Sequence, residues 1–284
     1  MKTLLLFAVT LGLITSAKAD LIFMDDFSGF SANQEINYNS GTGSTWKQKW
    51  DGNDATQRNL IKATGTGGAT LDTSIAVRNY HALAQTAFSI SAGETAVVSS
   101  DFQYTHGAGV AANVNKNFFG LLVSTTPDWW SGTNKAMSVA NRGAAIGNLL
   151  PVAPWTENWV LHANLGVDTL TGGTSDWLNA SMNLSINASG NYEGILEITK
   201  VADDSSVFTS SPVDLGLVAG TSLYAGYTTD WNNSPDSIAS VNNITSLGLN
   251  NFSISVTAVP EPSSLALVGL AGGLMAVRRR KRSV

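Results

Sequence analysis

The sequence predicts an all-β fold, built as an antiparallel sandwich or barrel. Short runs of β-branched and aromatic residues are separated by segments rich in Gly, Ser, Thr and Asn, as between the strands of such folds. Met182, Leu184 and Ile186 alternate with polar residues, which is typical of a strand with one buried and one wet face. No stretch of the body keeps a helical period over three turns.

Eight strands are expected, and turn residues lie between several of them. Ser189-Gly190-Asn191 stands just before one expected strand, and Asp203-Asp204-Ser205 follows it as a hairpin turn. No internal repeat and no linker divides the body, so a single domain is expected over residues 20–258. The expected strands are Leu21–Phe27, Val97–Tyr104, Phe118–Ser124, Trp159–Asn164, Met182–Asn187, Gly194–Val201, Ser222–Thr228 and Phe252–Val259.

The first 19 residues have the three parts of a secretory signal peptide. Lys2 supplies a positive start, Leu4 to Ile14 form an apolar run, and Ala17-Lys18-Ala19 ends in small residues. The run is too short to span a bilayer comfortably. We expect cleavage after Ala19, which makes Asp20 the mature N-terminus.

The last 26 residues, 259–284, have a different design. Two prolines in Val259-Pro260-Glu261-Pro262-Ser263 end any strand pairing and begin an extended linker. Residues 264–277 are uncharged and mostly apolar, and although they are fewer than the roughly 20 of a spanning helix, snorkelling arginines can extend them. One short transmembrane helix is therefore expected here. By the positive-inside rule its cytoplasmic end is the basic cluster Arg278, Arg279, Arg280, Lys281 and Arg282.

The body between these ends is acidic and has no cysteine. It holds nine of the 16 basic residues and 20 of the 21 acidic ones, which gives a net charge of −11. This charge argues against nucleic acid or an anionic membrane surface as a partner, and it is compatible with divalent cations. Without cysteine there is no disulfide and no thiol chemistry, so stability must come from the core.

The order and spacing of the parts in residues 259–284 resemble the PEP-CTERM sorting signal of Gram-negative bacteria. The matching parts are Val259-Pro260-Glu261-Pro262-Ser263, the apolar segment and the terminal Arg/Lys cluster, and the signal peptide is the usual companion. The glycine-rich, short apolar span departs from the pattern. The resemblance implies an exosortase-type partner, a membrane enzyme that severs the tail and leaves the protein at the cell surface or in extracellular polymer. It also implies an association with exopolysaccharide, and contact with the membrane through the tail alone.

The body resembles the concanavalin-like, or laminin-G-like, jelly roll at both of its ends. Asp25-Asp26-Phe27, the segment from Trp46 to Trp50 and the run from Asn250 to Val256 are similar to the first and last strands of that fold. The resemblance implies that the terminal strands are neighbours in one sheet. It also implies a scaffold that binds carbohydrate or matrix, in a fold that hosts binders and enzymes alike.

The sequence favours a non-enzymatic protein; the alternative is a secreted carbohydrate-active enzyme of the same fold. Hydrolases resembling this body carry Glu-x-Asp-x-Glu or a bulged variant of it, whereas here Ile195 stands between Glu193 and Glu197. Retaining glycosidases hold two carboxyl groups about 5–5.5 Å apart, whereas the backbones of two glutamates four residues apart on a strand are roughly 13 Å apart, so long side chains would have to converge. Without a central acid to organise them, Glu193 and Glu197 are expected to be solvated positions of an outward face. The histidines have no zinc-site spacing, and no serine stands in a nucleophile elbow; they are His81, His106 and His162.

Tryptophans in loop contexts are the candidate ligand platform. Sugars stack their C–H faces on aromatic rings, and a neighbouring Asp or Asn can hold the hydroxyls. Trp177 and Trp231 each follow an aspartate directly. The alternative is that these rings pack in the core or at its rim. The candidates are Trp130, Trp155, Trp177 and Trp231.

A structural calcium ion is a second candidate ligand, since Ca²⁺ takes six to eight oxygen ligands from side chains and carbonyls. Asp25 and Asp26 alternate across their strand, so one of them can face a given site. If the terminal strands pair, Asn251 lies alongside. The alternative is that the three residues are strand-end and turn residues.

Overall fold

The computed structural model describes residues 19–36, 45–50, 61–73, 79–107, 117–127, 132–140, 159–164, 173–230 and 244–258. Within these ranges every regular element is a β-strand. No helix in them is long and apolar enough to cross a membrane. The expected signal-peptide residues 1–18, with Ala17, and the whole tail from Val259 lie outside the described residues, and so does the expected C-terminal helix.

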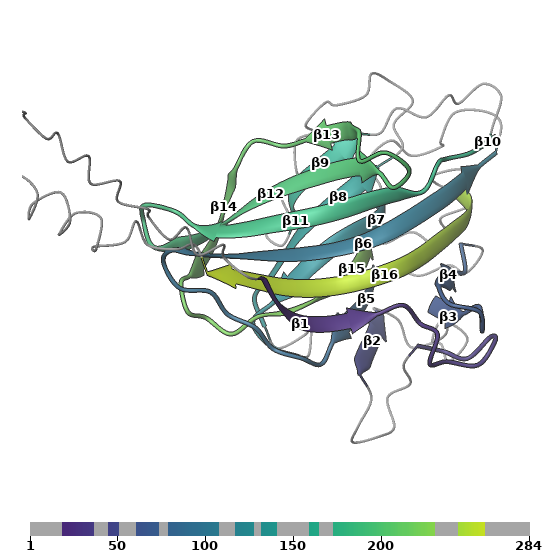
Figure 1. Cartoon of the computed structure of the whole chain (residues 1–284), viewed down its shortest axis with the longest axis horizontal. Coiled ribbons are helices and arrows are strands. Elements are labelled where there is room, and N and C mark those ends of the chain that lie inside the picture. The colour runs from purple at the N-terminus through teal and green to yellow at the C-terminus, as the bar shows by residue number, and fades with distance from the viewer. Residues whose placement is uncertain are drawn as a thin grey trace, which may run out of the picture.

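The strands form two sheets, and Figure 1 shows the larger of them, sheet A, nearest the viewer. Its hydrogen-bonded order is β13-β12-β11-β6-β16-β4-β3, with β1 also on β16, β10 on β6 and β14 on β12. Its strands are β1 (Ala19–Asp25), β3 (Ile61–Ala63), β4 (Ala69–Leu71), β6 (Glu94–His106), β10 (Gly173–Thr174), β11 (Leu178–Ile186), β12 (Asn191–Lys200), β13 (Ser206–Thr209), β14 (Val213–Val218) and β16 (Ile244–Ala258).

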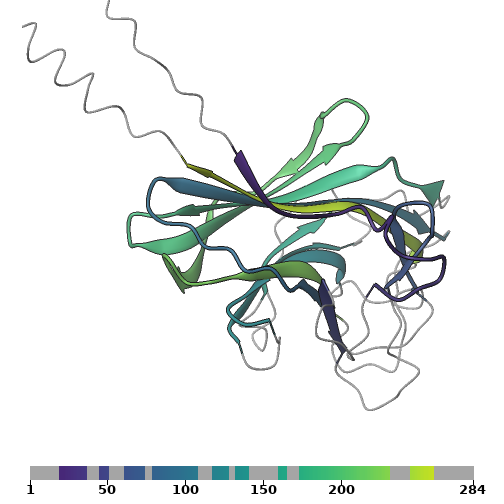
Figure 2. The same ribbon diagram turned by 60° about the horizontal axis from the view of Figure 1, so that its bottom comes forward.

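The second sheet, sheet B, stacks on the first, as the turned view in Figure 2 shows. Its order is β2-β5-β15-β7-β8-β9. Of all the strand pairs described, β8 with β9 alone is parallel. Its strands are β2 (Trp46–Trp50), β5 (Asn79–Ala84), β7 (Asn117–Ser124), β8 (Asn134–Ala140), β9 (Trp159–Asn164) and β15 (Tyr224–Asp230). The architecture is therefore a two-layer, almost wholly antiparallel β-sandwich, which confirms the predicted fold class.

All eight expected strands are present, and β9 has the expected bounds. Both expected turns are present as well. In the first, the Asn187 amide donates to the Asn191 carbonyl at 2.9 Å, and Gly190 takes a φ of 80°. In the second, Asp203 Oδ1 accepts the Ser205 amide at 3.0 Å. The left-handed φ of Asp204, 56°, completes that turn with a residue that tolerates this conformation.

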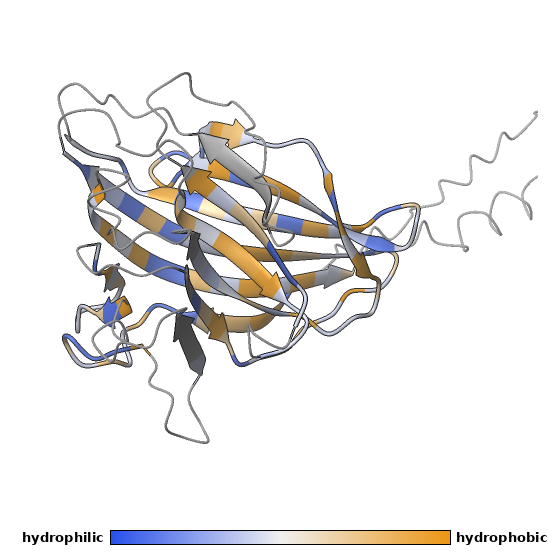
Figure 3. Cartoon of the chain, turned by 180° about the vertical axis from the view of Figure 1, so that it is seen from behind, coloured by the Kyte–Doolittle hydropathy of each residue, from blue (hydrophilic) through white to orange (hydrophobic). Residues whose placement is uncertain are grey.

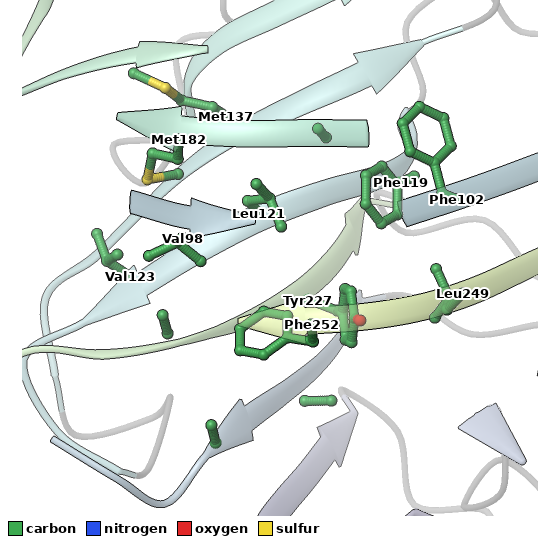
Figure 4. Close-up of a cluster of buried hydrophobic side chains, with 14 of the residues drawn as sticks. Val98, Phe102, Phe119, Leu121, Val123, Met137, Met182, Tyr227, Leu249 and Phe252 are labelled. Carbon is green, nitrogen blue, oxygen red and sulfur yellow. The ribbon is translucent and has the colours of Figure 1, made fainter. Parts of the chain in front are cut away.

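The core lies between the two sheets and is lined by alternate residues of each strand. Figure 3 shows hydrophilic and hydrophobic residues alternating along the strands, and Figure 4 shows where the inward ones meet. Phe102 of sheet A stacks on Phe119 of sheet B with ring centroids 4.5 Å apart. The alternation expected in β11 is confirmed, because Met182 and Leu184 are buried while Asn183 and Ser185 are partly exposed.

The first and last strands are neighbours, as the resemblance to the jelly roll implies. β1 runs antiparallel to the end of β16, with Ala19 opposite Thr257 and Asp25 opposite Phe252. A register shift between Leu21 and Phe23 divides β1 into two halves. The start of β1 therefore lies beside the end of β16, at one end of the sandwich (Figure 2).

Candidate functional site

Trp177 lies on the outward face of sheet A, just before β11. Its side chain is 38% exposed, which is high for an aromatic residue of this size. The ring reaches over the sheet to β16, where a Cβ added to Gly248 would lie 3.3 Å from the Trp177 Cη2 atom. Glycine at this position therefore lets the ring lie close to the backbone. Trp130, Trp155 and Trp231, the other candidate tryptophans, lie outside the described residues.

The chain before Trp177 is held to β6 by hydrogen bonds. The Ser175 amide donates to the Tyr104 carbonyl at 2.9 Å, and Ser175 Oγ accepts the Tyr104 amide at 3.1 Å. Gln103 Nε2 donates to the Ser175 carbonyl at 3.0 Å. The Trp177 carbonyl itself accepts a hydrogen bond from the Val201 amide at 2.9 Å. These contacts on both sides place the ring over the sheet without closing it off from solvent.

An ion pair stands beside the ring. Lys200 Nζ lies 3.0 Å from Asp176 Oδ2, and both side chains are well exposed. The hydrogen bond and charge of Asp176 raise the pKa of Lys200 above its usual value. Exposed pairs of this kind contribute little to stability. The pair is therefore a solvent-exposed contact, and Asp176 directly precedes Trp177 in the chain.

Polar side chains cover the outward face next to Trp177, across β11, β6 and β16. Asn179 Nδ2 donates to Asp101 Oδ1 at 2.8 Å, and Asn251 Nδ2 donates to Asp101 Oδ2 at 2.7 Å. Ser99 and Ser253 are hydrogen-bonded at 2.9 Å. We name this surface the polar face; its residues are Ser99, Asp101, Gln103, Asn179, Ser181, Asn183, Asn250, Asn251, Ser253 and Ser255. The strands that carry these side chains lie about 4.8 Å apart, and outward positions along one strand are separated by roughly 6.6 Å.

The three residues considered for calcium have protein partners. Asp25 accepts the Phe27 amide at 2.7 Å through Oδ1 and the Trp46 indole N–H at 2.6 Å through Oδ2. Asp26 Oδ1 accepts the Ser28 amide at 2.9 Å, and hydrogen bonds to the Ser28 hydroxyl and to this amide hold the pKa of Asp26 below its usual value. Asn251 takes a φ of 48° in a bulge of β16 and points its amide at Asp101, as described above. Within the described residues no group of three or more His, Cys, Asp or Glu side chains could hold a metal ion.

This geometry favours the alternative that Asp25 and Asp26 are strand-end and turn residues, not calcium ligands. Each carboxylate caps a backbone amide two residues on, which is how aspartate shapes a turn. Asp25 in addition holds the indole of Trp46 in the core. A calcium ion at this place stays a prediction.

The glutamates of β12 lie on the outward side of sheet A. Glu193 and Glu197 are partly exposed, and so is Ile195 between them. Glu197 Oε2 accepts Asn183 Nδ2 at 3.4 Å, and Glu193 pairs in register with Asp214 of β14. Each glutamate is thus a polar position on a solvated sheet face.

Two of the three histidines are buried and hydrogen-bonded. His81 Nδ1 lies 2.6 Å from Thr228 Oγ1 on the neighbouring strand, and burial lowers the pKa of His81 well below its usual range. The imidazole is therefore neutral near pH 7. His106 Nδ1 lies 3.0 Å from the Gly107 carbonyl. The side chain of His162 lies outside the described residues.

Comparison with known families identifies the end of the chain. Residues 258–282 match the family model of the PEP-CTERM protein-sorting motif. The tail is a PEP-CTERM sorting motif. The match starts at Ala258, the last residue of β16, and includes Val259 to Ser263, the apolar stretch and the basic cluster through Arg282. The PEP-CTERM motif therefore follows the folded body directly.

No curated protein sequence matches the chain. Solved structures resemble the body at low identity. An endo-1,3-β-glucanase from Streptomyces sioyaensis is 11% identical over 84% of this chain and 96% of its own, with a TM-score of 0.46. Lectin I from Ulex europaeus, in complex with the methyl glycoside of α-L-fucose, is 12% identical over 86% and 99%, with a TM-score of 0.46. A lectin from Bauhinia forficata in complex with GalNAc is 11% identical over 86% and 100%, with a TM-score of 0.44.

The sequence did not predict that the residues of the polar face lie together next to Trp177. Asp101 and Asn179 are 78 residues apart, and Asp101 and Asn251 are 150 residues apart. One local signal was present: Asn179, Ser181, Asn183 and Ser185 alternate with apolar residues. That period places all four on one face of a strand. Which strands pair with this one on either side cannot be read from its local sequence.

Proposed function

We propose that this protein is exported and sorted by an exosortase-type system, and that its sandwich associates with extracellular polysaccharide without catalysing a reaction. The observation that carries the proposal is the PEP-CTERM motif at residues 258–282, which begins at the end of the folded body. The expected signal peptide before Asp20 supports export. The expected destination is the cell surface or the extracellular matrix, after a transient stay in the inner membrane.

Polysaccharide association is supported by the surroundings of Trp177. An exposed indole offers a flat apolar surface for the C–H face of a sugar ring. The polar face continues from it with amides and hydroxyls, which can exchange hydrogen bonds with sugar hydroxyls. Asp101 is the carboxylate hydrogen-bonded to two amides of this face, so the surface is suited to neutral polar groups.

The absence of catalysis is supported by the arrangement of β12. Glu193 and Glu197 lie on a solvated sheet face, and the position between them is Ile195. Two carboxyl groups of a retaining glycosidase must lie about 5–5.5 Å apart across the scissile bond. At their backbones two glutamates four residues apart on a strand are separated by roughly 13 Å, so their side chains would have to converge, and the central acid that would organise them is replaced by Ile195.

Replacing Pro260, Glu261 and Pro262 together by alanine tests the sorting function. Mass spectrometry of the protein from fractionated cells should find the parent without residues 278–284, in the outer fraction. The variant should still end at Val284 and remain with the inner membrane, because the sorting enzyme no longer recognises its tail. Pro212→Ala, which removes an exposed proline of the body, is the control and should behave like the parent. A parent protein in the outer fraction that still ends at Val284 would refute the proposal.

Trp177→Ala tests the polysaccharide platform. Binding of the mature protein to a glycan array and to the exopolysaccharide of the producing cells should weaken about fivefold, since an aromatic contact is worth roughly 1 kcal/mol. Val218→Ala is the matched control, because Val218 is an apolar side chain, 65% exposed, on β14. Thermal unfolding of both variants checks that the fold is kept. Equal binding by parent and Trp177→Ala would sink this part of the proposal.

A further inference from the structure

The sorting motif stands very close to the folded body. β16 ends at Ala258, and Val259 alone separates it from Pro260-Glu261-Pro262. Even if fully extended, the five residues from Val259 to Ser263 span at most about 17 Å. An enzyme that holds this motif must therefore come within a few residues of the sandwich.

The end of β16 is covered on both edges. On one side Ser255 to Ala258 pair with Val97 to Glu94 of β6. On the other side Ser255, Val256 and Thr257 pair with Leu21, Asp20 and Ala19 of β1. We name the three pairs between β1 and β16 the junction pair. While the junction pair is formed, the β1-side edge of β16 is covered from Ser255 to Thr257, just before the motif.

The junction pair has the features of a segment that opens locally. Ala19, Asp20 and Leu21 are all exposed, and Leu21 is 61% exposed. The register shift between Leu21 and Phe23 separates them from the anchored half of β1. In that half, Phe23 packs on Trp46 and Phe252 with ring centroids 5.6 Å and 6.0 Å apart. Few buried contacts and a position at the chain terminus are the conditions for local opening.

Proteins commonly recognise one another by pairing an extended backbone with an exposed strand edge. Cleavage of the signal peptide after Ala19 would remove the pair Ala19–Thr257 and leave Asp20 and Leu21 as the cover over Val256 and Ser255 of β16. We infer that these first residues of β1 act as a removable cover, and that the sorting enzyme takes their place on the edge of β16 before it cuts the tail. The opening of the junction pair precedes processing, while the pairing of β16 with β6 is kept. This inference rests on the proposed sorting of the tail.

A disulfide across the junction pair tests the order of these steps. Leu21 and Ser255 are register partners, and both point away from the core, so Leu21→Cys/Ser255→Cys removes no buried side chain. The chain has no other cysteine, and bacterial export compartments oxidise thiols. In the full chain expressed in its own cells, tail processing should be lost in this variant. It should return when a reductant is added to the culture.

The control joins the same two strands on the other side of the register shift. Met24→Cys/Ser253→Cys locks the anchored half of β1 and leaves the junction pair free, so its tail should be processed as in the parent. A third variant adds six Gly and Ser residues after Ala258 to the junction disulfide. It should regain processing, because the motif then reaches the enzyme without the edge of β16.

For the parent and all three variants, mass spectrometry of the mature N- and C-termini shows whether the signal peptide and the tail have been removed. Normal processing with the junction disulfide formed overturns the inference, and so does equal loss with both disulfides. A parent that keeps its tail to Val284 instead refutes the sorting proposal itself, so the two failures are distinguishable.

Discussion

Replacing Gly226 by alanine is expected to prevent the sandwich from folding stably. Gly226 lies in β15 between β5 and β7, opposite Leu83 on one side and Leu122 on the other. An added Cβ would overlap the carbonyl oxygen of Ala82, which belongs to the backbone of β5. Backbone atoms cannot turn aside as a side chain does, so β15 and β5 must separate. We expect a loss of about 3 kcal/mol or more in the free energy of unfolding.

Urea denaturation of the purified mature protein measures this loss. Gly29→Ala is the matched control, since a Cβ at Gly29 meets no atom within 4 Å and its φ is not left-handed. The control should stay within about 0.5 kcal/mol of the parent. A Gly226→Ala protein as stable as the control would show that the two strands are not in contact at this point.

Trp46→Ala is expected to cost about 4 kcal/mol of stability. The indole is fully buried and stacks on Tyr227, with ring centroids 5.5 Å apart and planes at 10°. It also meets the edge of Phe252 at 4.9 Å, so it joins the inner faces of the two sheets. Its N–H donates to Asp25 Oδ2, and truncation leaves that oxygen without this donor. Both losses act in the same direction.

Trp46→Phe separates the two contributions. The ring contact is largely kept, while the hydrogen bond to Asp25 is removed, so the loss should be smaller, about 1–3 kcal/mol. Denaturation midpoints of the two variants in urea make the comparison. If Trp46→Phe were as unstable as Trp46→Ala, ring packing would not be the main contribution of this residue.

The fold class could be predicted because most strands of sheet A have one face buried in the core and the other exposed to solvent. β11 and β12 alternate buried and partly exposed residues along their length, and this period is visible in the sequence. β5 and β8 were missed for the opposite reason. In β5 the adjacent residues Leu83 and Ala84 are both buried, and in β8 so are Ala136 and Met137, so the alternation disappears. β3, β4 and β10 have three residues or fewer, too short for any period to show.

Of the candidate site, the sequence predicted Trp177 but not the residues around it. Trp177 was singled out from its neighbour Asp176, but its exposure depends on Gly248, 71 positions later in the chain. The partners of Asp25 illustrate the same limit, because the Trp46 indole that it binds is 21 residues away. The sorting motif, by contrast, is a local pattern of a few residue types in a fixed order. It could be recognised from Val259 to Arg282 without knowledge of the fold.

The place of β16 in sheet A bears on how the chain crosses the inner membrane. β16 is the last strand of the body, and it lies between β6 and β1 in the middle of the sheet. A chain whose C-terminal part is still being translocated lacks this strand, and β1 then has no partner among the described strands. Pairings between such distant segments also form slowly. Sheet A can therefore be completed only after the chain has emerged as far as residue 258.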